Sequence, residues 1–296
     1  MATIFDIQKK YRGKLDYLDL ELIIAHAIKK SREFVLSHPE KKITKKQETI
    51  TNNFIERRIE CEPLAYILGK KEFYGLKFKV NKNTLIPRPE TEMMVDLATK
   101  NLQLITNNKK LFIIDIGTGS GNIIIAIAKQ LQNLELRIKN LEFIGIDISK
   151  KALQIAKQNA KTHKVDKKIK FIHGNLLEPF IKKLKIKNKK SKNIIIANLP
   201  YGWSAWKNNS SAETIGIKFE PSIALFTGKK GLELYEKLLM HLLQFKKNNQ
   251  NILALLEIDP RQSAGIKKMI KKYFPKAKIT FYKDLSGKWR LCELKI

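Results

Sequence analysis

The stretch LFIIDIGTGSGN, residues 111–122, decides the fold of this 296-residue chain. It opens with an almost wholly apolar run that is typical of a buried strand, and a second apolar run follows the glycines. Glycine can adopt positive φ and lets a ligand lie against bare backbone, and the free N–H groups at a helix start bind polar or anionic groups. The stretch therefore predicts a strand, a ligand-binding loop and a helix. The loop residues expected to hold the ligand are Gly117, Thr118, Gly119, Ser120 and Gly121.

An acid follows at the end of the next strand-like run, LEFIGIDI at 141–148, where Asp147 stands 26 residues after Gly121. A carboxylate in that position can accept hydrogen bonds from the two ribose hydroxyls of a nucleoside ligand. The loop lacks both the spacing of a dinucleotide fingerprint and the Lys-Ser/Thr of a triphosphate site, so neither NAD nor ATP fits. Together with Asp115, DIGTGSG resembles the cofactor motif of S-adenosylmethionine-dependent methyltransferases. Asp115 is alternatively a loop or helix cap.

Strand-like runs alternate with helical segments through the rest of the chain, which favours a parallel sheet covered by helices on both faces. The tail around Ser286-Gly287 is typical of a hairpin. With the resemblance above, the pattern predicts an α/β fold: a Rossmann-like, seven-stranded methyltransferase domain with a closing antiparallel hairpin. The expected strand runs are LFIIDI, LEFIGIDI, IKFIHG, NIIIAN and NILALLEI, followed by the two arms of the tail.

The N-terminal region has a different texture, because residues 15–36 place apolar side chains at helical spacing. Thr44 and Gln47 have the spacing of a capping box that opens a further helix. Asn-rich turn chemistry and two prolines then suggest a hairpin and a rigid connector. We expect a small helical domain at 1–75, the hairpin and connector at 76–90, and the α/β domain at 91–296.

Two residues at the end of the third strand run are further cofactor candidates. In the methyltransferase class this position usually carries an acid that binds the adenine amine, and here it is Asn175. Its side-chain carbonyl can accept from the amine without carrying charge, and Leu176 would give apolar contact to the ring. The alternative for Asn175 is an ordinary turn residue.

The fourth strand run ends in Asn198, Leu199, Pro200 and Tyr201. Two acceptors, the Asn198 side-chain carbonyl and the Pro200 backbone carbonyl, could bind both N–H groups of an amide or exocyclic amine and stabilise the positive charge that develops on its nitrogen. Proline offers only an acceptor and stiffens the turn, and Tyr201 could stack on the planar group. We expect all four residues to bind the substrate, with Asn198 also lining the cofactor site. Asn198, Pro200 and Tyr201 are the catalytic candidates, and no metal is required; the alternative is a proline turn after a strand.

Motifs on both sides of this stretch decide which acceptor is favoured. Five segments in order resemble the HemK/PrmC family of peptide chain release factor glutamine N5-methyltransferases, from about residue 56 to the end. By that resemblance the cofactor is S-adenosylmethionine, the substrate is the glutamine of the Gly-Gly-Gln loop of bacterial class-1 release factors, and the N-terminal helices help to dock the factor. The segments are EPLAYILGKKEFYGLKF at 62–78, LIPRPETE at 85–92, FEPSIALFTGKKGLELY at 219–235, LLEIDPRQ at 255–262 and KDLSGKWR at 283–290.

The chain departs from the family pattern at two places. The family has Asn-Pro-Pro-Tyr where this chain has Leu199, and Asn-Leu-Pro-Tyr resembles ribosomal RNA adenine dimethyltransferases instead. Lys229 and Lys230 stand where the family commonly has an acidic residue. An RNA or DNA adenine-N6 methyltransferase therefore remains an alternative, as do a ribosomal-protein glutamine methyltransferase and a cofactor-binding scaffold without activity.

The formal charge of +30 comes from lysines scattered over the chain rather than interleaved with aromatics, so we interpret it as a solvated basic surface. We expect no direct nucleic-acid requirement. Cys61 and Cys292 lack metal-site spacing and suit a reducing compartment. There is no apolar run of the ~20 residues that a membrane span needs. We expect a cytoplasmic enzyme without a membrane partner, acting as a monomer.

Overall fold

The computed structural model describes most of the chain, and it divides into two compact units. The helical unit comprises residues 1–70 with 216–219, and the larger sheet unit comprises the described residues of 71–203 and 220–296. The described residues are 1–103, 110–134, 140–183, 192–203, 216–246 and 251–296.

The helical unit is built on a core of aliphatic side chains that includes Ile4, Leu20 and Ile55, each at most 1% exposed. The capping box of Thr44 and Gln47 is confirmed, since each backbone N–H bonds to the other side chain, at 2.9 and 3.2 Å. The helices are α1 (Ile4–Tyr11), α2 (Tyr17–Ile28), α3 (Arg32–Ser37), α4 (Lys45–Ile59) and α5 (Leu64–Leu68).

The single helix expected over 15–36 was wrong, because this segment contains two helices, α2 and α3. Lys29 adopts a left-handed backbone conformation, with φ 57°, which ends α2. The Ser31 side chain then accepts a hydrogen bond from the N–H of Phe34 and begins α3. Capping groups thus divide a segment whose apolar spacing is continuous.

The N-terminal hairpin lies at β1 (Lys70–Phe73) and β2 (Leu76–Lys79), earlier than the expected segment 76–90. Tyr74 and Gly75 both have positive φ, 51° and 67°, as a tight two-residue hairpin turn requires. A connector follows β2, and its 3₁₀ turn, η1 (Pro89–Thr91), leads directly into α6 (Glu92–Gln103).

The expected sheet is confirmed, with seven strands of the described residues in the order β5-β4-β3-β6-β7-β9-β8. The first five are parallel, whereas β9 runs antiparallel to β7 and forms the closing hairpin with β8. The order reverses between β3 and β6, which is where open α/β sheets bind ligands. The strands are β3 (Leu111–Ile116), β4 (Leu141–Asp147), β5 (Ile169–His173), β6 (Lys192–Ala197), β7 (Asn251–Glu257), β8 (Lys278–Lys283) and β9 (Trp289–Lys295).

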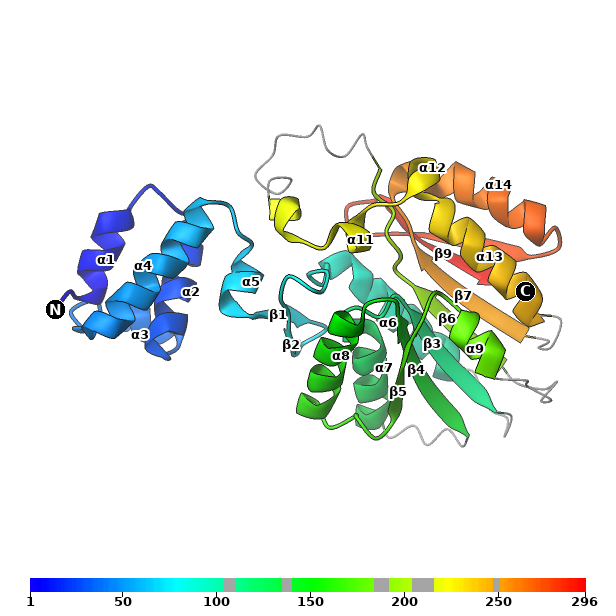
Figure 1. The fold of residues 1–296 in the computed structure, drawn as a ribbon, viewed down its shortest axis with the longest axis horizontal. Helices are drawn as coiled ribbons and strands as arrows, with labels where there is room; N and C mark the ends of the chain where they lie inside the picture. Colours follow the sequence, from blue (N-terminus) through cyan, green and yellow to red (C-terminus); the bar gives the residue numbers. More distant parts are fainter. Residues whose placement is uncertain (104–109, 135–139, 184–191, 204–215, 247–250) are drawn as a thin grey trace. The chain divides into compact units, whose positions relative to one another are not determined.

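Helices cover both faces of this sheet (Figure 1), and alternate strand residues enter two separate cores. Ile113 packs with α6, α7 (Asn122–Asn133) and α8 (Lys150–Thr162). Its neighbour Ile114 packs with α9 (Glu178–Lys183), α13 (Glu233–Lys246) and α14 (Ser263–Tyr273) on the other face. Burial on both faces explains why these strands are continuously apolar. The shorter elements are η3 (Ile217–Phe219), α11 (Ser222–Leu225), α12 (Gly228–Gly231) and η4 (Pro260–Gln262).

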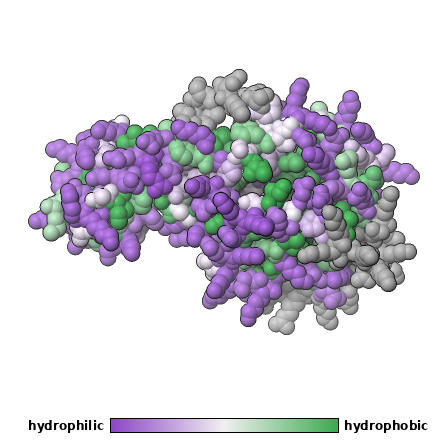
Figure 2. Space-filling model, in the orientation of Figure 1, coloured by the Kyte–Doolittle hydropathy of each residue, from purple (hydrophilic) through white to green (hydrophobic). Residues whose placement is uncertain are grey.

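The surface of both units visible in Figure 2 is mainly hydrophilic. Residues 1–70 hold 14 Lys or Arg against 10 Asp or Glu, whereas residues 71–296 hold 44 against 18. The basic excess thus belongs to the sheet-containing part of the sequence rather than to the helices expected to dock a partner. Among the described residues, no helix combines the length and the apolar character needed to cross a membrane.

Candidate active site

The glycine loop, residues 117–121, joins β3 to α7 at the carboxyl end of the sheet. Its three glycines have positive φ between 55° and 79°. The N–H groups of Gly117 and Thr118 both donate to the carbonyl of Ile146, at 2.8 and 3.0 Å, which ties the loop to β4. The Thr118 hydroxyl donates to Asp115 at 2.6 Å. The positive φ expected at the glycines is confirmed, and the loop conformation is held by backbone and buried polar groups.

Gly121 has a second reason to lack a side chain. A Cβ at this position would lie 2.8 Å from Cδ1 of Ile125 and 3.2 Å from Cβ of Ala156. Helices α7 and α8 thus approach each other closely at the loop. The same residue satisfies a left-handed backbone and a tight helix contact.

Asp147 ends β4 and turns its carboxylate onto the glycine loop. Its two oxygens accept from the backbone N–H groups of Gly119 and Ser149, each at 2.8 Å. Burial raises the pKa of Asp147, while the N–H groups oppose that shift. A carboxylate oxygen accepts more than one hydrogen bond, so Asp147 keeps capacity for a ligand. The structure brings loop and acid together, and the ribose contact stays a prediction.

Asn175 and Leu176 lie in the turn after β5, which is bound to β4 by the N–H of Gly174 donating to the carbonyl of Asp147 at 3.0 Å. The Asn175 amide nitrogen donates to Glu178 at 3.4 Å, at the start of α9. That leaves the side-chain carbonyl of Asn175 as the group for the predicted adenine contact. Leu176 is 6% exposed and has φ 47°, so most of its side chain packs in the core.

The clamp, residues 198–201, begins where β6 ends beside β3, with Ala197 in register with Ile116. A Cβ on Gly117 would lie 3.3 Å from Cδ2 of Leu199 and 3.8 Å from the backbone oxygen of Asn198. The glycine loop and the clamp, 77 or more residues apart in the sequence, are therefore direct neighbours. This places the expected cofactor and acceptor residues at one edge of the sheet.

Leu199, the departure from the family pattern, is 3% exposed and belongs to the core. Its backbone N–H bonds to the Tyr235 hydroxyl, which in turn donates to the backbone carbonyl of Glu257. A proline at position 199 would lack that N–H. Leucine therefore supplies packing and a backbone donor that the family residue does not have.

Tyr201 is partly buried, and its hydroxyl donates to Glu257 Oε1 at 3.2 Å. The Tyr201 carbonyl accepts from Gln262 Nε2 at 3.1 Å, and a Cβ on Gly231 would overlap that same carbonyl. The ring is thus anchored through its hydroxyl. Its stacking on a planar acceptor, and the acceptor role of Pro200, stay predictions.

Two supporting residues were not among the predicted site residues, because their roles depend on contacts with remote segments, although Thr91 lies within the motif LIPRPETE. Asn159 on α8, 1% exposed, donates to the carbonyls of Ser120 and Lys79 at 2.8 and 3.0 Å, so it links the glycine loop to β2. Thr91 in η1 accepts from the Asn198 amide nitrogen at 3.2 Å. These contacts join segments that are remote in the sequence.

Other residues of the sequence motifs, and the tryptophans after the clamp, have structural contacts of their own or lie outside the described residues. Arg88 forms an ion pair with Glu220, and Glu220 also accepts from the N–H of Ile86 at 2.9 Å. The ring of Trp203 lies 4.5 Å from the guanidinium of Arg261. Trp206, for which no role was found, lies outside the described residues.

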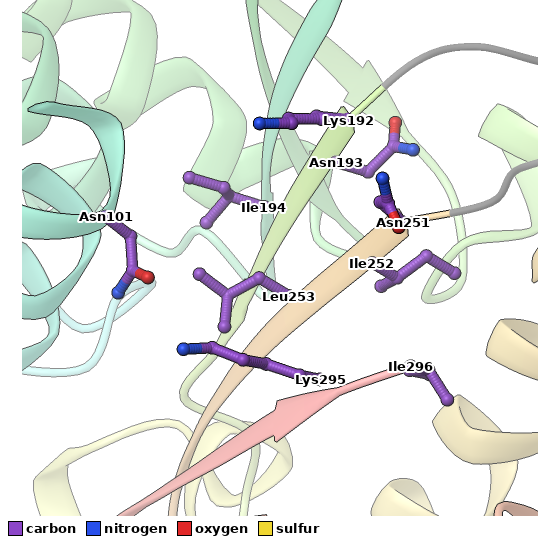
Figure 3. Close-up of a pocket in the computed structure, with 9 residues that line it drawn as sticks. All are labelled: Asn101, Lys192, Asn193, Ile194, Asn251, Ile252, Leu253, Lys295 and Ile296. Carbon is purple, nitrogen blue, oxygen red and sulfur yellow. The ribbon is translucent and has the colours of Figure 1, made fainter. Parts of the chain in front are cut away.

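A separate pocket of about 470 Å³ lies at the opposite edge of the sheet, where β6 and β7 begin and β9 ends. Ile194 and Leu253 lie between Lys192 and Lys295 in this pocket (Figure 3). None of the clamp or glycine-loop residues lines it. The candidate active site is therefore not this pocket but the carboxyl end of the parallel strands, where the glycine loop and the clamp meet.

Comparison with known proteins agrees with this geometry. Residues 107–222 match a family described as a methyltransferase domain, and residues 13–69 match the PrmC N-terminal domain. The chain is 32% identical over 272 residues to the release factor glutamine methyltransferase of Bacillus anthracis, covering 92% of this chain and 89% of the relative. It is 34% identical over 291 residues to that of Mycoplasma mycoides subsp. mycoides, covering 97% and 96%.

The chain belongs to the release factor glutamine methyltransferase family. The resemblance drawn from the sequence motifs and the assignment as a methyltransferase are thereby confirmed. Among solved structures, the chain is similar to the hMettl16 catalytic domain in complex with the MAT2A 3′UTR hairpin 6. That match has a TM-score of 0.56 at 17% identity and covers 82% of this chain and 81% of the other. At that identity it supports the fold alone.

Proposed function

We propose that this enzyme transfers a methyl group from S-adenosylmethionine to the side-chain nitrogen N5 of the glutamine in the Gly-Gly-Gln motif of bacterial class-1 release factors. The observation that carries the proposal is the close approach of the glycine loop to the clamp, which leaves no more than contact distance for a Cβ on Gly117. The loop offers a nucleoside site and the clamp offers acceptors for an amide. Relatives across most of the chain are named release factor glutamine methyltransferases.

The residues of the glycine loop fit the cofactor. Positive φ at its glycines leaves the backbone open to a ligand, and the Asp147 carboxylate is fixed beside Gly119. Gly117–Gly121 and Asp147 would hold the nucleoside, with Asn175 and Leu176 at the adenine and Asn198 beside the methionine end. The N-terminal domain of human METTL16, which has the same fold with a TM-score of 0.51, was solved in complex with SAH. When bound, S-adenosylmethionine supplies an electrophilic methyl group.

The clamp prepares the acceptor nitrogen. An amide nitrogen is a weak nucleophile because its lone pair is delocalised into the carbonyl. In the proposed mechanism the Asn198 side-chain carbonyl and the Pro200 backbone carbonyl accept hydrogen bonds from its two N–H groups, which orients the lone pair and stabilises the developing positive charge. As the new N–C bond forms, the bond between the methyl group and the cofactor sulfur would break, and one of the two N–H protons would then pass to water. Tyr201 lies against the planar amide. Electrostatic stabilisation of this kind is commonly worth ~10²–10³ in rate.

The domain roles complete the proposal. Residues 1–75 dock the release factor, residues 76–90 connect this domain to the sheet, and residues 91–296 catalyse the methyl transfer. The enzyme acts as a cytoplasmic monomer and requires no nucleic acid. The family match at 13–69 and the ion pair of Arg88 with Glu220, which holds the connector, support this division.

Mass spectrometry tests the function. The enzyme is incubated with labelled S-adenosylmethionine and either a purified release factor or purified ribosomal RNA. We expect one added methyl group on the Gly-Gly-Gln glutamine and none when that glutamine is replaced by alanine. Label on the RNA, with no mass gain on the release factor, would contradict the proposal and favour an adenine methyltransferase.

A further inference from the structure

Two buried polar residues next to the clamp, Thr91 and Glu257, have no part in the mechanism above. Glu257 ends β7 and is 1% exposed, although an ionised carboxylate is costly to bury unless it is paired or hydrogen-bonded. Thr91 in η1 is also 1% exposed. With Asn198 and Tyr201 these residues form the amide network, which joins three segments remote in the sequence.

The hydrogen bonds of the amide network run in one direction. Tyr201 donates to Glu257 Oε1 at 3.2 Å, while Glu257 Oε2 is buried without a hydrogen-bond partner among the described residues. The Thr91 hydroxyl lies close enough to the carboxyl group to lower the pKa of Glu257, which favours the ionised carboxylate. An ionised carboxylate can only accept, and a hydroxyl has a single proton to donate. Thr91 Oγ1 accepts from Asn198, so its own proton is free to point to the nearby Glu257 carboxylate, and toward Asn198 it acts as an acceptor.

This direction fixes the Asn198 amide. Its nitrogen Nδ2 donates to Thr91 Oγ1 at 3.2 Å, so the carbonyl oxygen occupies the other arm of the planar group. If the amide were reversed, its NH₂ would meet the N–H groups of the substrate amide, donor against donor. Only the observed orientation leaves Asn198 as the acceptor that methyl transfer requires.

We propose that Glu257 and Thr91 are positioning residues that hold the Asn198 side-chain amide with its carbonyl oxygen toward the acceptor glutamine. The inference rests on the proposed function for its consequence in turnover. It also has a consequence in the free enzyme, because the same hydrogen bonds protect the Asn198 NH₂ protons without any substrate.

The charge of Glu257 makes the orientation depend on pH. Thr91 and Glu90 face it from η1 and Arg290 from β9, with Tyr201 and Tyr235 as the remaining neighbours. Burial raises the pKa of Glu257 to about 7, against the hydrogen bonds of Thr91 and Tyr201 and the charge of Arg290. Protonated Glu257 can donate to Thr91, which then has its own proton free for the Asn198 carbonyl. Turnover should therefore fall as the pH drops through about 7.

Steady-state kinetics on the full-length enzyme test the positioning role. Thr91→Val keeps the shape of the side chain but removes the hydroxyl, and we expect kcat to fall at least tenfold while the Kd for S-adenosylmethionine, measured by calorimetry, stays within twofold. Thr91→Ser restores the hydroxyl and should recover most of kcat. Glu257→Gln should lower kcat and abolish the acid limb near pH 7. Wild-type kcat in Thr91→Val, or an unchanged acid limb in Glu257→Gln, would overturn the proposal.

An NMR measurement keeps the proposal testable if the release factor proves not to be the substrate. The side-chain NH₂ signals of Asn198, assigned with Asn198→Asp, should exchange with solvent at least fivefold faster in Thr91→Val than in the wild type. Thr91→Ser should keep the slow exchange. Equal exchange in the wild type and Thr91→Val would overturn the amide orientation, whatever the substrate; a failed methylation assay with altered exchange would overturn only the proposed function.

Discussion

The glycine loop with Asp147 is held mainly by backbone groups, whereas the clamp is held mainly by side chains from distant segments. In the loop, the backbone N–H groups of Gly117 and Thr118 donate to a main-chain carbonyl, and the Asp147 carboxylate accepts from main-chain N–H groups, all in adjacent strands and turns. In the clamp, Asn198 and Tyr201 depend on Thr91 and Glu257, side chains that are 107 and 56 residues away. The proposed cofactor site is thus encoded in one short motif, while the proposed acceptor site depends on segments from across the sheet.

Two glycine substitutions, one in the glycine loop and one packed against the clamp, should have the largest and most different effects on cofactor binding and turnover. Gly231→Ala would place a Cβ onto the Tyr201 carbonyl at φ 79°, and Gly121→Ala would press α7 onto α8 at the same φ. Overpacking of about 1–3 kcal/mol adds to left-handed strain of about 1–2 kcal/mol in each case. We expect Gly231→Ala to abolish turnover but keep cofactor binding, and Gly121→Ala to lose cofactor binding. Calorimetric titration with S-adenosylmethionine measures the difference.

Gly287→Ala is the matched control for this pair. It has the same sign of φ, 77°, but no neighbouring atom within 4 Å of the added Cβ. It should change stability by strain alone and leave cofactor binding intact. Loss of cofactor binding in Gly231→Ala with a folded protein would contradict the division into two regions.

Substitutions of the proposed functional side chains should also affect turnover and cofactor binding separately. Asn198→Ala removes one acceptor of the clamp, and we expect kcat to fall ~10²–10³-fold with cofactor binding kept. Asp147→Asn leaves the clamp intact but replaces a charged acceptor, so the Kd for the cofactor should rise ~10-fold or more. Single-turnover kinetics with calorimetry distinguish the two effects. Equal activity of Asn198→Ala and the wild type would remove the clamp from the mechanism.

The buried acid Asp115, near the end of β3 and next to the glycine loop, should make the stability of the fold depend on pH. Burial raises the pKa of Asp115 to about 7, against the hydrogen bond from Thr118. Its contribution to stability is fully present below its ordinary value near 4 and is lost as the pH rises through about 7, a change of about 4 kcal/mol at most. Asp115→Asn should therefore gain stability relative to the wild type as the pH increases from 5 to 8.

Urea unfolding at several pH values checks this prediction. Asp166→Asn, which replaces an exposed carboxylate, is the control and should show no such trend. A difference between Asp115→Asn and the wild type that stays constant from pH 5 to 8 would be inconsistent with a titrating Asp115.

The smallest effect is expected at Lys229 and Lys230, the second departure from the family pattern. Both have a left-handed backbone, with φ 52° and 54°, where glycine would be free of strain. Lys230→Gly should raise the free energy of unfolding by about 1 kcal/mol. Lys229→Gly should gain less, because Lys229 also pairs with Glu236. Urea unfolding of the two variants measures both values, and a loss of stability in Lys230→Gly would show that its backbone is not strained.

Much of the fold could be predicted because local sequence patterns specify its strands and several helix ends. Continuous apolar runs such as LFIIDI identify strands that are buried on both faces. The capping box of Thr44 and Gln47 was found from spacing alone. The helix division at Lys29 was missed, since a left-handed cap without glycine leaves no mark in the apolar period.

The sequence by itself determined the glycine loop, Asp147 and the clamp, because each is a contiguous group whose residue types suit one chemistry. Only the tertiary structure decided what orients them. Thr91 ends η1, Asn198 follows β6 and Glu257 ends β7, and these residues meet because β6 lies between β3 and β7 and the connector ends beside them. The role of Leu199 was also visible only in the tertiary structure, where its side chain is buried and its backbone N–H donates to Tyr235. Hydrogen bonds are directional and short, so their partners follow from strand order and register, which no single motif contains.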